Sequence, residues 1–347
     1  MTRVYLPYEC WPQADVLTWE FAIAAGDVLD GRGPAHRWRP ATRRTNIEHY
    51  SRWLAFMLTA EGNLDKRPAA RVTKPNVRAY IEHLKGSIAP RTVVSSLVGL
   101  KVMMQAMSPD DDWRWLADIC NRLHRNAVPS VDKRARMLSS NDLQQKALRY
   151  LDKLAKTDLN KRKELVGYRN GLMVALMAAH PLRRKNFAEL SLGTTIRETQ
   201  AGWMIDIPGA VTKNGQPIQF EVADRLTPYL KTYLECVRSR IAAPLENALW
   251  VSWDGGRMVH HMVYIAFTRI TVELFGRPIN PHLFRDCAAT TLASHSLRGA
   301  MAAPGLLGHL STQTTEKHYI HARQLEASRK MNEILLSLAS PKGTSAT

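Results

Sequence analysis

A histidine, a run of hydroxyl side chains and a tyrosine stand close together near the end of the chain, in the stretch LLGHLSTQTTEKHYIHA. The tyrosine, Tyr319, has two interpretations. It could be a core residue whose hydroxyl makes a hydrogen bond, as in most partly buried tyrosines. It could instead be a nucleophile. A phenol has a pKa of about 10 and is mostly protonated at neutral pH, so a nucleophilic Tyr319 needs cationic or proton-accepting groups from elsewhere in the chain.

Three basic residues upstream have positions that suit such a role. Arg183 follows the helix breaker Pro181 and stands at the start of a new turn, from which it can reach inward. His282 and Arg285 are three residues apart, so a helix would place both on one face. Taken singly, these signals are weak, because arginines at helix starts are usually solvated.

A fourth candidate is Lys213, which lies between two segments that alternate in polarity like β-strands, GWMIDIP and QPIQFEV. It stands directly before Asn214 and Gly215, a dipeptide that strongly favours a hairpin turn. The hairpin would present the lysine ammonium group at its tip. An exposed lysine without a function is the commoner case, and only the combination with the other residues favours a chemical role.

The composition indicates a polyanionic partner. The 347 residues contain 48 Lys and Arg against 31 Asp and Glu, which gives a formal net charge of +17. Nucleic acid fits this excess better than an acidic membrane surface, because the basic residues are spread through helical patterns and are not gathered in one cluster. We expect no membrane span, since the longest apolar run is too short to cross a bilayer.

The four cysteines are far apart and form no CxxC pair, which argues against a disulfide framework and against a zinc site. Neither a P-loop glycine pattern nor an acidic metal cluster stands out. The N-terminus lacks the apolar core of a signal peptide. We therefore expect no metal, no cofactor and a cytoplasmic location.

Apolar periodicity predicts a helical first half and a mixed second half, so the expected fold class is mainly α with a small β-sheet (α+β). A helix-like stretch, ADVLTWEFAIAAGDVL, precedes the breaker cluster DGRGP, and helical spacing then recurs in four stretches between Pro40 and Ala127. In the second half, Ser140 or Asn141 could cap the first helix, and a long apolar helix ends at Ala179-His180-Pro181.

These patterns divide the chain into five parts. We expect an N-terminal extension over residues 1–37, a helical domain over 38–128, an exposed basic linker over 129–138, a larger mixed domain over 139–340 and a flexible tail over 341–347. The linker could be a plain solvated connection or could contact phosphates, and the sequence favours the two interpretations about equally.

In chain order, the candidate residues form a pattern that resembles the tyrosine recombinases, the phage integrase family. The catalytic groups of that family follow the order Arg, Lys, His-x-x-Arg, His, Tyr, and the LLGH step here is similar to the family's LGH segment. The matching residues are Arg183, Lys213, His282, Arg285, His309 and Tyr319. The predicted helical domain resembles the family's core-binding domain. Where the family usually carries a step like Thr-Gly-Leu-Arg, this chain has HPLR.

The resemblance implies a catalytic role for each matching residue. Arg183 and Arg285 would clamp the scissile phosphate and stabilise its transition state, and Lys213 would protonate the leaving 5′-hydroxyl. His282 could accept the phenolic proton or orient the phosphate, and His309 could donate a hydrogen bond to a phosphoryl oxygen. The division of roles between the two histidines stays open. The 3′-phosphotyrosyl product would need neither a metal nor ATP for resealing.

The resemblance further implies a site-specific DNA recombinase or integrase that acts as a tetramer on two sites in double-stranded DNA. A type IB topoisomerase or a telomere resolvase would share this chemistry, but the small helical domain and the overall size favour a recombinase. A catalytically inactive DNA-binding accessory protein is the alternative from another class. All six positions carry the residue types that catalysis requires, which argues against it.

Two further surfaces are expected to bind partners. Basic side chains outside the catalytic set are candidates for phosphate contacts: Arg43, Arg44, Arg91, Lys133 and Arg134. Beyond the tyrosine, LEASRKMNEILLSLAS places an apolar stripe on one side of a helix, made of Met331, Ile334, Leu335 and Leu338. This helix could pack on its own domain or, as the resemblance implies, dock on a neighbouring protomer.

Overall fold

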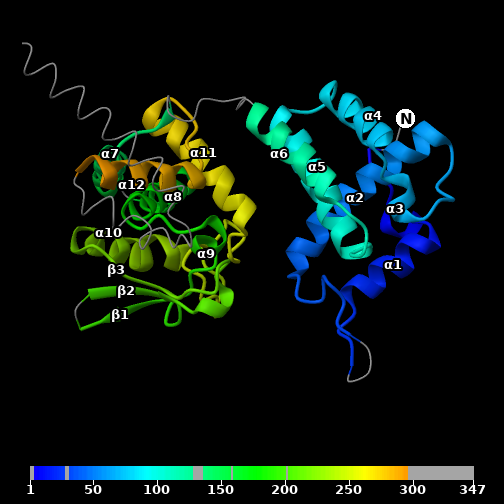
Figure 1. Ribbon diagram of the computed structural model, residues 1–347. Helices are drawn as coiled ribbons and strands as arrows, with labels where there is room; N and C mark the ends of the chain where they lie inside the picture. The colour runs from blue at the N-terminus through cyan, green and yellow to red at the C-terminus, as the bar shows by residue number, and fades with distance from the viewer. Residues whose placement is uncertain (1–3, 28–30, 128–135, 158, 201, 296–347) are drawn as a thin grey trace, which may run out of the picture. The chain divides into compact units, whose positions relative to one another are not determined.

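The computed structural model describes residues 4–27, 31–127, 136–157, 159–200 and 202–295. The chain divides into two compact units, Met1–Asp132 and Lys133–Thr347, and each is described by itself (Figure 1). The described elements are helices and a three-stranded sheet, so the predicted α+β class is confirmed. Within the described residues, none of the helices combines the length and the apolar character that crossing a membrane requires.

The described part of unit 1 is helical. Its helices are α1 (Gln13–Ile23), α2 (Pro40–Glu61), α3 (Pro68–Arg71), α4 (Lys74–Lys85), α5 (Pro90–Met107) and α6 (Arg114–Asn126). The four helices predicted beyond Pro40 correspond to α2, α4, α5 and α6. A proline in the first turn sets the backbone for the start of α2, α4 and α5, where its missing N–H costs no helical hydrogen bond.

Helices α2 and α5 pack antiparallel and very close together. The ring of His49 on α2 lies against Gly99 on α5, where an added Cβ would meet the ring carbon Cδ2 at 2.4 Å. One turn further along α2, Arg52 Nη1 donates to Ser96 Oγ over 3.4 Å. Residue numbers rise along one helix as they fall along the other, so the two helices run in opposite directions. The close approach at His49 requires glycine at position 99.

The N-terminal segment contributes to the core of unit 1. Trp11 and Trp19 are buried in the same apolar cluster as residues of α2 and α5. The Tyr50 hydroxyl donates to Asp15 Oδ1 over 2.6 Å, and Arg71 forms an ion pair with the same carboxylate oxygen. The side chains of Asp15 and Arg71 are both fully buried. The segment predicted as an extension thus supplies one partner of a buried ion pair to the helical bundle.

Two predicted helix boundaries were wrong. Helix α1 ends at Ile23 and does not continue to Leu29, because the backbone leaves the helical region at Ala24, whose ψ is 136°. Helix α7 (Ser140–Ala155) is capped by Ser139, whose hydroxyl accepts from Asp142 N at 3.0 Å. Ser140 and Asn141, the predicted caps, already lie inside that helix.

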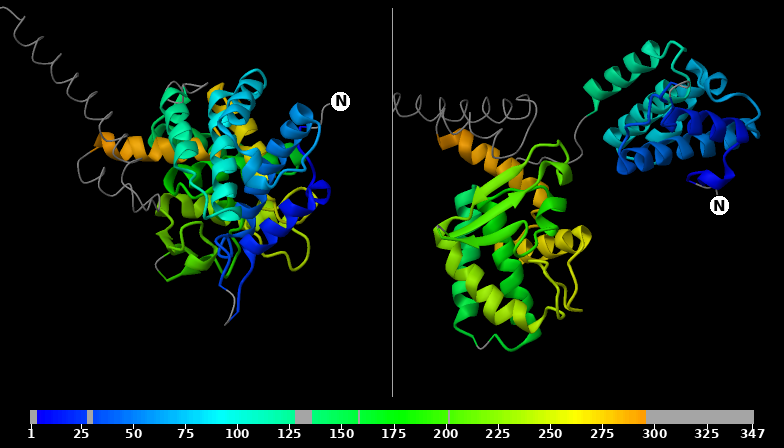
Figure 2. Two further views of the ribbon diagram at one scale, coloured as in Figure 1. Left: turned by 45° about the vertical axis from the view of Figure 1, so that its right-hand side comes forward. Right: turned by 90° about the horizontal axis from the view of Figure 1, so that it is seen from below.

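Unit 2 combines helices with the sheet. Its described helices are α7, α8 (Arg162–Ala179), α9 (Arg184–Ala188), α10 (Thr227–Thr232), α11 (His260–Phe275) and α12 (Pro281–His295), and its described strands are β1 (Ile196–Thr199), β2 (Gly202–Ile207) and β3 (Ile218–Glu221). The sheet is antiparallel in the order β1-β2-β3 and lies along one side of the helices (Figure 2). Alternate residues of β2 face the core, where Trp203, Ile205 and Ile207 are buried.

A chain of aromatic rings joins three helices in the core of unit 2. Phe187 of α9 stacks on Trp250 with ring centroids 5.1 Å apart, and it also meets Phe267 of α11 edge to face at 5.7 Å. Phe267 in turn meets Phe284 of α12 at 5.3 Å. All four rings are buried. Because such contacts prefer defined geometries, they fix α9, α11 and α12 relative to one another.

Candidate active site and DNA-contacting residues

Residues 180–183, here named the arginine turn, connect helix α8 to helix α9. The His180 amide donates to the Leu176 carbonyl at 2.8 Å, and this is the last helical hydrogen bond of α8. Pro181 has no N–H to continue the helix, so α8 ends where the sequence predicted. Arg183 has an extended backbone, caps α9 and is half-buried. The turn therefore directs an arginine inward from a junction between two helices.

Arg285 of α12 lies beside this turn. Arg285 is 6% exposed, and its Nη1 donates to the main-chain carbonyl of Pro181. The pKa of Arg285 is lowered to about 10, chiefly by burial and also by the positive charge of Arg183, while Asp286 opposes the shift. Burial also lowers the pKa of Arg183. Two guanidiniums held near one another and partly desolvated form a site that an anion such as a phosphate would stabilise.

The aromatic chain of the core positions both arginines. Phe284 precedes Arg285 in α12, and Phe187 lies four residues after Arg183 in α9. Since Phe187 and Phe284 both pack on Phe267, the two helix starts keep a fixed separation. The arginine pair therefore rests on a packed core, and its geometry does not depend on a surface loop.

Lys213 is exposed in the connection between β2 and β3, residues 208–217, here named the Lys213 loop. The two strands pair antiparallel, with Ile207 opposite Ile218, so the predicted hairpin is present. Residues 209–211 form a 3₁₀ turn, and Gly215 has a left-handed φ of 77°.

The Lys213 loop folds back on itself. Thr212 is fully buried, and its hydroxyl lies 3.0 Å from the Gly209 carbonyl and 2.8 Å from the Gln216 carbonyl. Gly209 allows this, because a Cβ there would meet the Gly215 carbonyl oxygen at 2.3 Å. Lys213 is consequently part of a compact loop.

His282 is exposed in the first turn of α12, three residues before Arg285. That turn is fixed by Asn280, whose side chain accepts from Leu283 N at 3.0 Å. His309 and Tyr319 lie outside the described residues, as do Lys133, Arg134 and the predicted C-terminal helix. In the part of the chain that the structure describes, no three His, Cys, Asp or Glu side chains gather as metal ligands.

The DNA-contact candidates of unit 1 do not form one cluster. Arg43 and Arg44 lie in the first turns of α2, whereas Arg91 lies in the first turn of α5. Because the two helices are antiparallel, these positions lie near opposite ends of the helix pair, about 20 Å apart at the rise of an α-helix. Arg44 and Arg91 are exposed, while Arg43 is half-buried and donates to the His36 carbonyl at 2.8 Å.

Arg52 lies between those two ends and was not predicted from the sequence. It is half-buried beside Ser96, at the crossing of α2 and α5. The pKa of the neighbouring His49 is lowered. The burial of His49 is the largest cause, the positive charge of Arg52 adds to it, and Glu48 opposes it. The available signal was its spacing, since Arg52 follows Arg44 by eight residues and so shares roughly one side of the helix.

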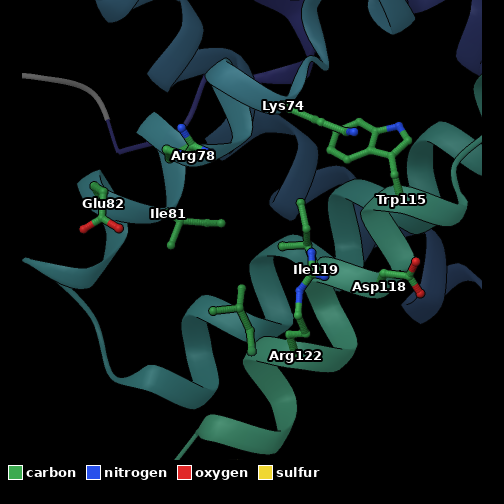
Figure 3. A pocket seen from close by; sticks show the side chains of 9 residues that line it. Lys74, Arg78, Ile81, Glu82, Trp115, Asp118, Ile119 and Arg122 are labelled. Atoms are coloured by element: carbon green, nitrogen blue, oxygen red, sulfur yellow. The ribbon is translucent and has the colours of Figure 1, made fainter.

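A separate groove lies between α4 and α6 of unit 1 (Figure 3). Ile81 and Ile119 line it with Trp115, and its charged residues are of both signs: Lys74, Arg78 and Arg122 against Glu82 and Asp118. None of the predicted DNA-contact residues lines this groove. Its mixed charge makes it a poorer phosphate surface than the α2 and α5 pair.

Comparison with known proteins identifies the relatives of this chain. The sequence profile of the phage integrase family matches residues 143–326. Among solved structures, the XerH site-specific recombinase bound to its difH substrate before cleavage is 16% identical with a TM-score of 0.54, covering 83% of this chain and 78% of that chain. The post-cleavage complex of XerH with palindromic difH is 15% identical with a TM-score of 0.55, covering 83% and 80%.

No curated protein sequence matches the chain. At these low identities, the structural similarity shows a shared fold. The profile match spans more than half of the chain and includes the arginine turn, the Lys213 loop and the start of α12, together with Tyr319. The chain therefore belongs to the phage integrase family of tyrosine recombinases, which are enzymes that break and rejoin DNA.

Proposed function

We propose that this enzyme is a site-specific recombinase that cleaves a DNA strand with the Tyr319 hydroxyl and stores the strand as a 3′-phosphotyrosyl link. The observation that best supports this role is the arginine pair. Arg285 is buried and bonded to the arginine turn, and Arg183 extends from the same turn. These contacts fix the position of the guanidinium. A donor that stabilises a transition state must be fixed in this way, whereas a solvated surface arginine need not be.

The arginine pair suits the charge that develops during phosphoryl transfer. Attack of the phenolic oxygen on the phosphorus gives a pentacoordinate transition state with extra negative charge on the nonbridging oxygens. Each guanidinium offers a planar fork of donors that matches two phosphate oxygens. Arg183 and Arg285 would hold this charge without rearranging, because their positions are already set by the core.

Three further residues would move or hold protons. As the Tyr319 oxygen bonds to phosphorus, the bond from phosphorus to the 5′ oxygen breaks, and Lys213 donates the proton that this oxygen needs. His282 accepts the phenolic proton or orients the phosphate, and His309 donates a hydrogen bond to a phosphoryl oxygen. The exposed position of His282 beside Arg285 is compatible with either of its two roles.

Rejoining would reverse these steps. A free 5′-hydroxyl attacks the phosphotyrosyl link, and Tyr319 leaves with a proton. The energy of the phosphodiester is kept in the covalent link, so resealing consumes no ATP, and the cationic residues take the place of a metal in balancing charge. We propose that two DNA sites are exchanged within a tetramer and that the C-terminal helix, residues 325–340, docks on a neighbouring protomer.

The DNA duplex would be held by both units. In unit 1 we assign this contact to the helix pair of α2 and α5, with Arg44, Arg52 and Arg91 spread along it. In unit 2 we assign it to the exposed basic groups beside the arginine pair. Lys133 and Arg134 join the two units in sequence and would add phosphate contacts there.

The deciding experiment uses a nicked suicide substrate that carries the recombination site. Cleavage releases a short strand, so the covalent complex cannot be resealed and accumulates. Peptide mapping should find the DNA attached to Tyr319, and sequencing of the attached strand should identify the cleavage position. Attachment elsewhere, for instance at Tyr264 or Ser311, would refute the assignment of the nucleophile.

Product analysis separates the alternatives. Strand exchange between two sites is expected for a recombinase. Relaxation of supercoils without exchange would instead identify a type IB topoisomerase, and hairpin ends would identify a telomere resolvase. Specific DNA binding with no covalent complex on any substrate would identify an inactive accessory protein.

A further inference from the structure

His180 connects the arginine turn to the hairpin that carries Lys213. Its ring stacks on Phe220 of β3, with centroids 5.5 Å apart and ring planes inclined by 27°. Its Nε2 accepts a hydrogen bond from the Ala223 amide at 3.4 Å. The residue is 8% exposed. One side chain therefore contacts both the last strand of the hairpin and the backbone that follows it.

The same turn also holds Arg285. Pro181, the next residue, accepts a hydrogen bond from the Arg285 guanidinium through its carbonyl. Consecutive residues of one short turn thus contact the hairpin on one side and the buried arginine on the other, while Arg183 lies two residues further along.

The imidazole acts here as a neutral acceptor. Burial lowers the pKa of His180 to about 4, so the ring is uncharged at neutral pH. A protonated ring would present an N–H to the Ala223 amide and would bury a charge. The hydrogen-bond geometry and the burial both favour the neutral form.

A displacement of β3 would be carried to Lys213. The strand pairs with β2 up to Ile207 and Ile218, which are the two ends of the Lys213 loop. Within the loop, buried Thr212 and the contact of Gly209 with Gly215 leave little freedom. A packed loop moves with its ends, so the position of Lys213 follows the position of β3.

We propose that His180 is a positioning residue that holds the Lys213 loop at a fixed place relative to Arg183 and Arg285. The inference rests on the proposed function in one respect, the role of Lys213 as the general acid. His180 itself touches neither DNA nor the reacting atoms. Its effect is to keep the ammonium group of Lys213 at a fixed position relative to the guanidiniums of Arg183 and Arg285.

The test compares two DNA substrates. In the second substrate, sulfur replaces the bridging 5′ oxygen at the cleavage site. The bond from phosphorus to sulfur then breaks to release a thiolate, which needs no proton, because a thiol has a pKa of about 8.5 and is far more acidic than an alcohol. A variant that lacks only proton donation therefore recovers cleavage on the sulfur substrate, and a variant with a damaged phosphate clamp does not.

Five variants of the full-length protein separate the contributions. His180→Phe keeps a ring on Phe220 but removes the acceptor, and His180→Gln keeps an acceptor at similar reach but removes the stacked ring. Phe220→Leu weakens the same contact from the side of β3. Lys213→Ala is the reference for loss of the general acid, and Arg285→Lys is the reference for a damaged clamp.

We expect all three contact variants to cleave ordinary DNA at least tenfold more slowly than the wild type and to recover most of that loss on the sulfur substrate, as Lys213→Ala does. Arg285→Lys should remain slow on both substrates. DNA affinity, measured by gel shift, should stay within about twofold in every contact variant. A general acid contributes about a hundredfold or more, which leaves room for a tenfold effect of misplacement.

Two results would overturn the inference while leaving the proposed function intact. In the first, Lys213→Ala recovers on the sulfur substrate but the His180 and Phe220 variants do not. In the second, those variants cleave ordinary DNA as fast as the wild type. If Lys213→Ala itself fails to recover, the general-acid role of Lys213 is wrong, and the inference about His180 falls with it.

Discussion

The buried guanidinium of Arg285 donates a hydrogen bond to the main-chain carbonyl of Pro181, two residues before Arg183. This contact joins residues that are 104 positions apart in the chain. Because its acceptor is a backbone atom, the contact requires no acceptor side chain from the arginine turn. The two arginines of the proposed phosphate clamp are therefore already held together in the structure, and they would not have to be ordered at the moment of reaction.

Replacing either arginine by lysine should strongly reduce cleavage. In Arg183→Lys and Arg285→Lys the positive charge is kept but the donor fork is lost. We expect each variant to form the covalent complex on the suicide substrate about a hundredfold more slowly or worse, the usual loss when a fixed donor to a transition-state oxyanion is removed. Single-turnover rates at saturating protein give the comparison.

Arg184 provides the matched control for this pair. It is adjacent in sequence but exposed, and its guanidinium lies over the Tyr264 ring at 5.8 Å on the surface of unit 2. Arg184→Lys should cleave at close to the wild-type rate. Equal losses in all three variants would indicate a general effect of basic charge on DNA binding and would remove the distinction that we draw for Arg183 and Arg285.

Stability should fall with acid through His180. Its pKa is lowered to about 4 in the folded protein by burial, whereas an unfolded chain has the ordinary value near 6.5. Between these values the unfolded state binds the additional proton, so the free energy of unfolding rises with pH in that range. The contribution of His180 is complete above about pH 6.5 and is lost as the pH falls towards 4. The loss amounts to about 3 kcal/mol at most.

The variant His180→Phe isolates the contribution of His180 to the pH dependence of stability, since a phenylalanine ring does not titrate. Urea unfolding of unit 2, followed by hydrogen exchange of the amides of α8, should show a shallower loss of stability for the variant than for the wild type between pH 6.5 and 4. Carboxylates protonate over part of the same range in both proteins, and the comparison cancels them. Parallel curves would mean that His180 gains no proton on unfolding in this range.

Local patterns in the sequence predicted the helices well, and long-range contacts explain what they missed. The apolar spacing of α2, α4, α5 and α6 is a property of each segment alone, so each helix could be identified. The role of the N-terminal segment could not be predicted, because Asp15 pairs with Arg71 across 56 residues. No pattern in the sequence near Asp15 indicates that its carboxylate is buried. The Asn214-Gly215 step predicted a hairpin correctly, yet the burial of Thr212 decided the shape of its loop.

The candidate site was accessible from sequence only through its resemblance to a family. No periodicity relates Arg183 to Arg285, and the contact of His180 with Ala223 spans 43 residues. Chain order supplied the set of residues, while the packing of Phe187, Phe267 and Phe284 supplied the reason that two of them meet. Arg52 was missed because a single arginine inside an amphipathic helix is usually a solvated residue.

DNA affinity should depend steeply on salt, and Arg52 should contribute to that dependence. Each phosphate that a protein neutralises on duplex DNA adds a slope of about −0.9 to log K against log salt. Arg52→Gln, Arg44→Gln and Arg91→Gln should each weaken binding at low salt and reduce the slope by about 0.9. Titrations at several salt concentrations measure both quantities.

The control for the salt experiment is Arg114→Gln. It removes the same charge from unit 1, but the Arg114 guanidinium is already paired with Asp112, with Nη2 and Oδ2 2.8 Å apart. Its slope should match that of the wild type. A reduction as large as that of Arg52→Gln would attribute the effect to net charge rather than to contacts along α2 and α5.

Deleting the N-terminal segment should destabilise unit 1, although the sequence marks this segment as an extension. The deletion of residues 1–37 removes Trp11 and Trp19 from the core and leaves the fully buried Arg71 without the carboxylate of Asp15. Breaking a buried ion pair by removing one partner typically costs about 3–5 kcal/mol. We expect the truncated protein to lose protection of the α2 amides against hydrogen exchange and to lose DNA binding with it.

Point variants separate the ion pair from the lost apolar contacts. Asp15→Asn should destabilise unit 1 by about 3–5 kcal/mol, because a buried guanidinium then faces a neutral amide, and Arg71→Met should do the same for the carboxylate. The double variant Asp15→Leu with Arg71→Met removes both charges and should be more stable than either single variant. Arg114→Met, which breaks an exposed pair, should change the stability of unit 1 little. If the double variant is no more stable than the single variants, the charges of Asp15 and Arg71 do not stabilise one another, and the broken ion pair does not account for the cost of the deletion.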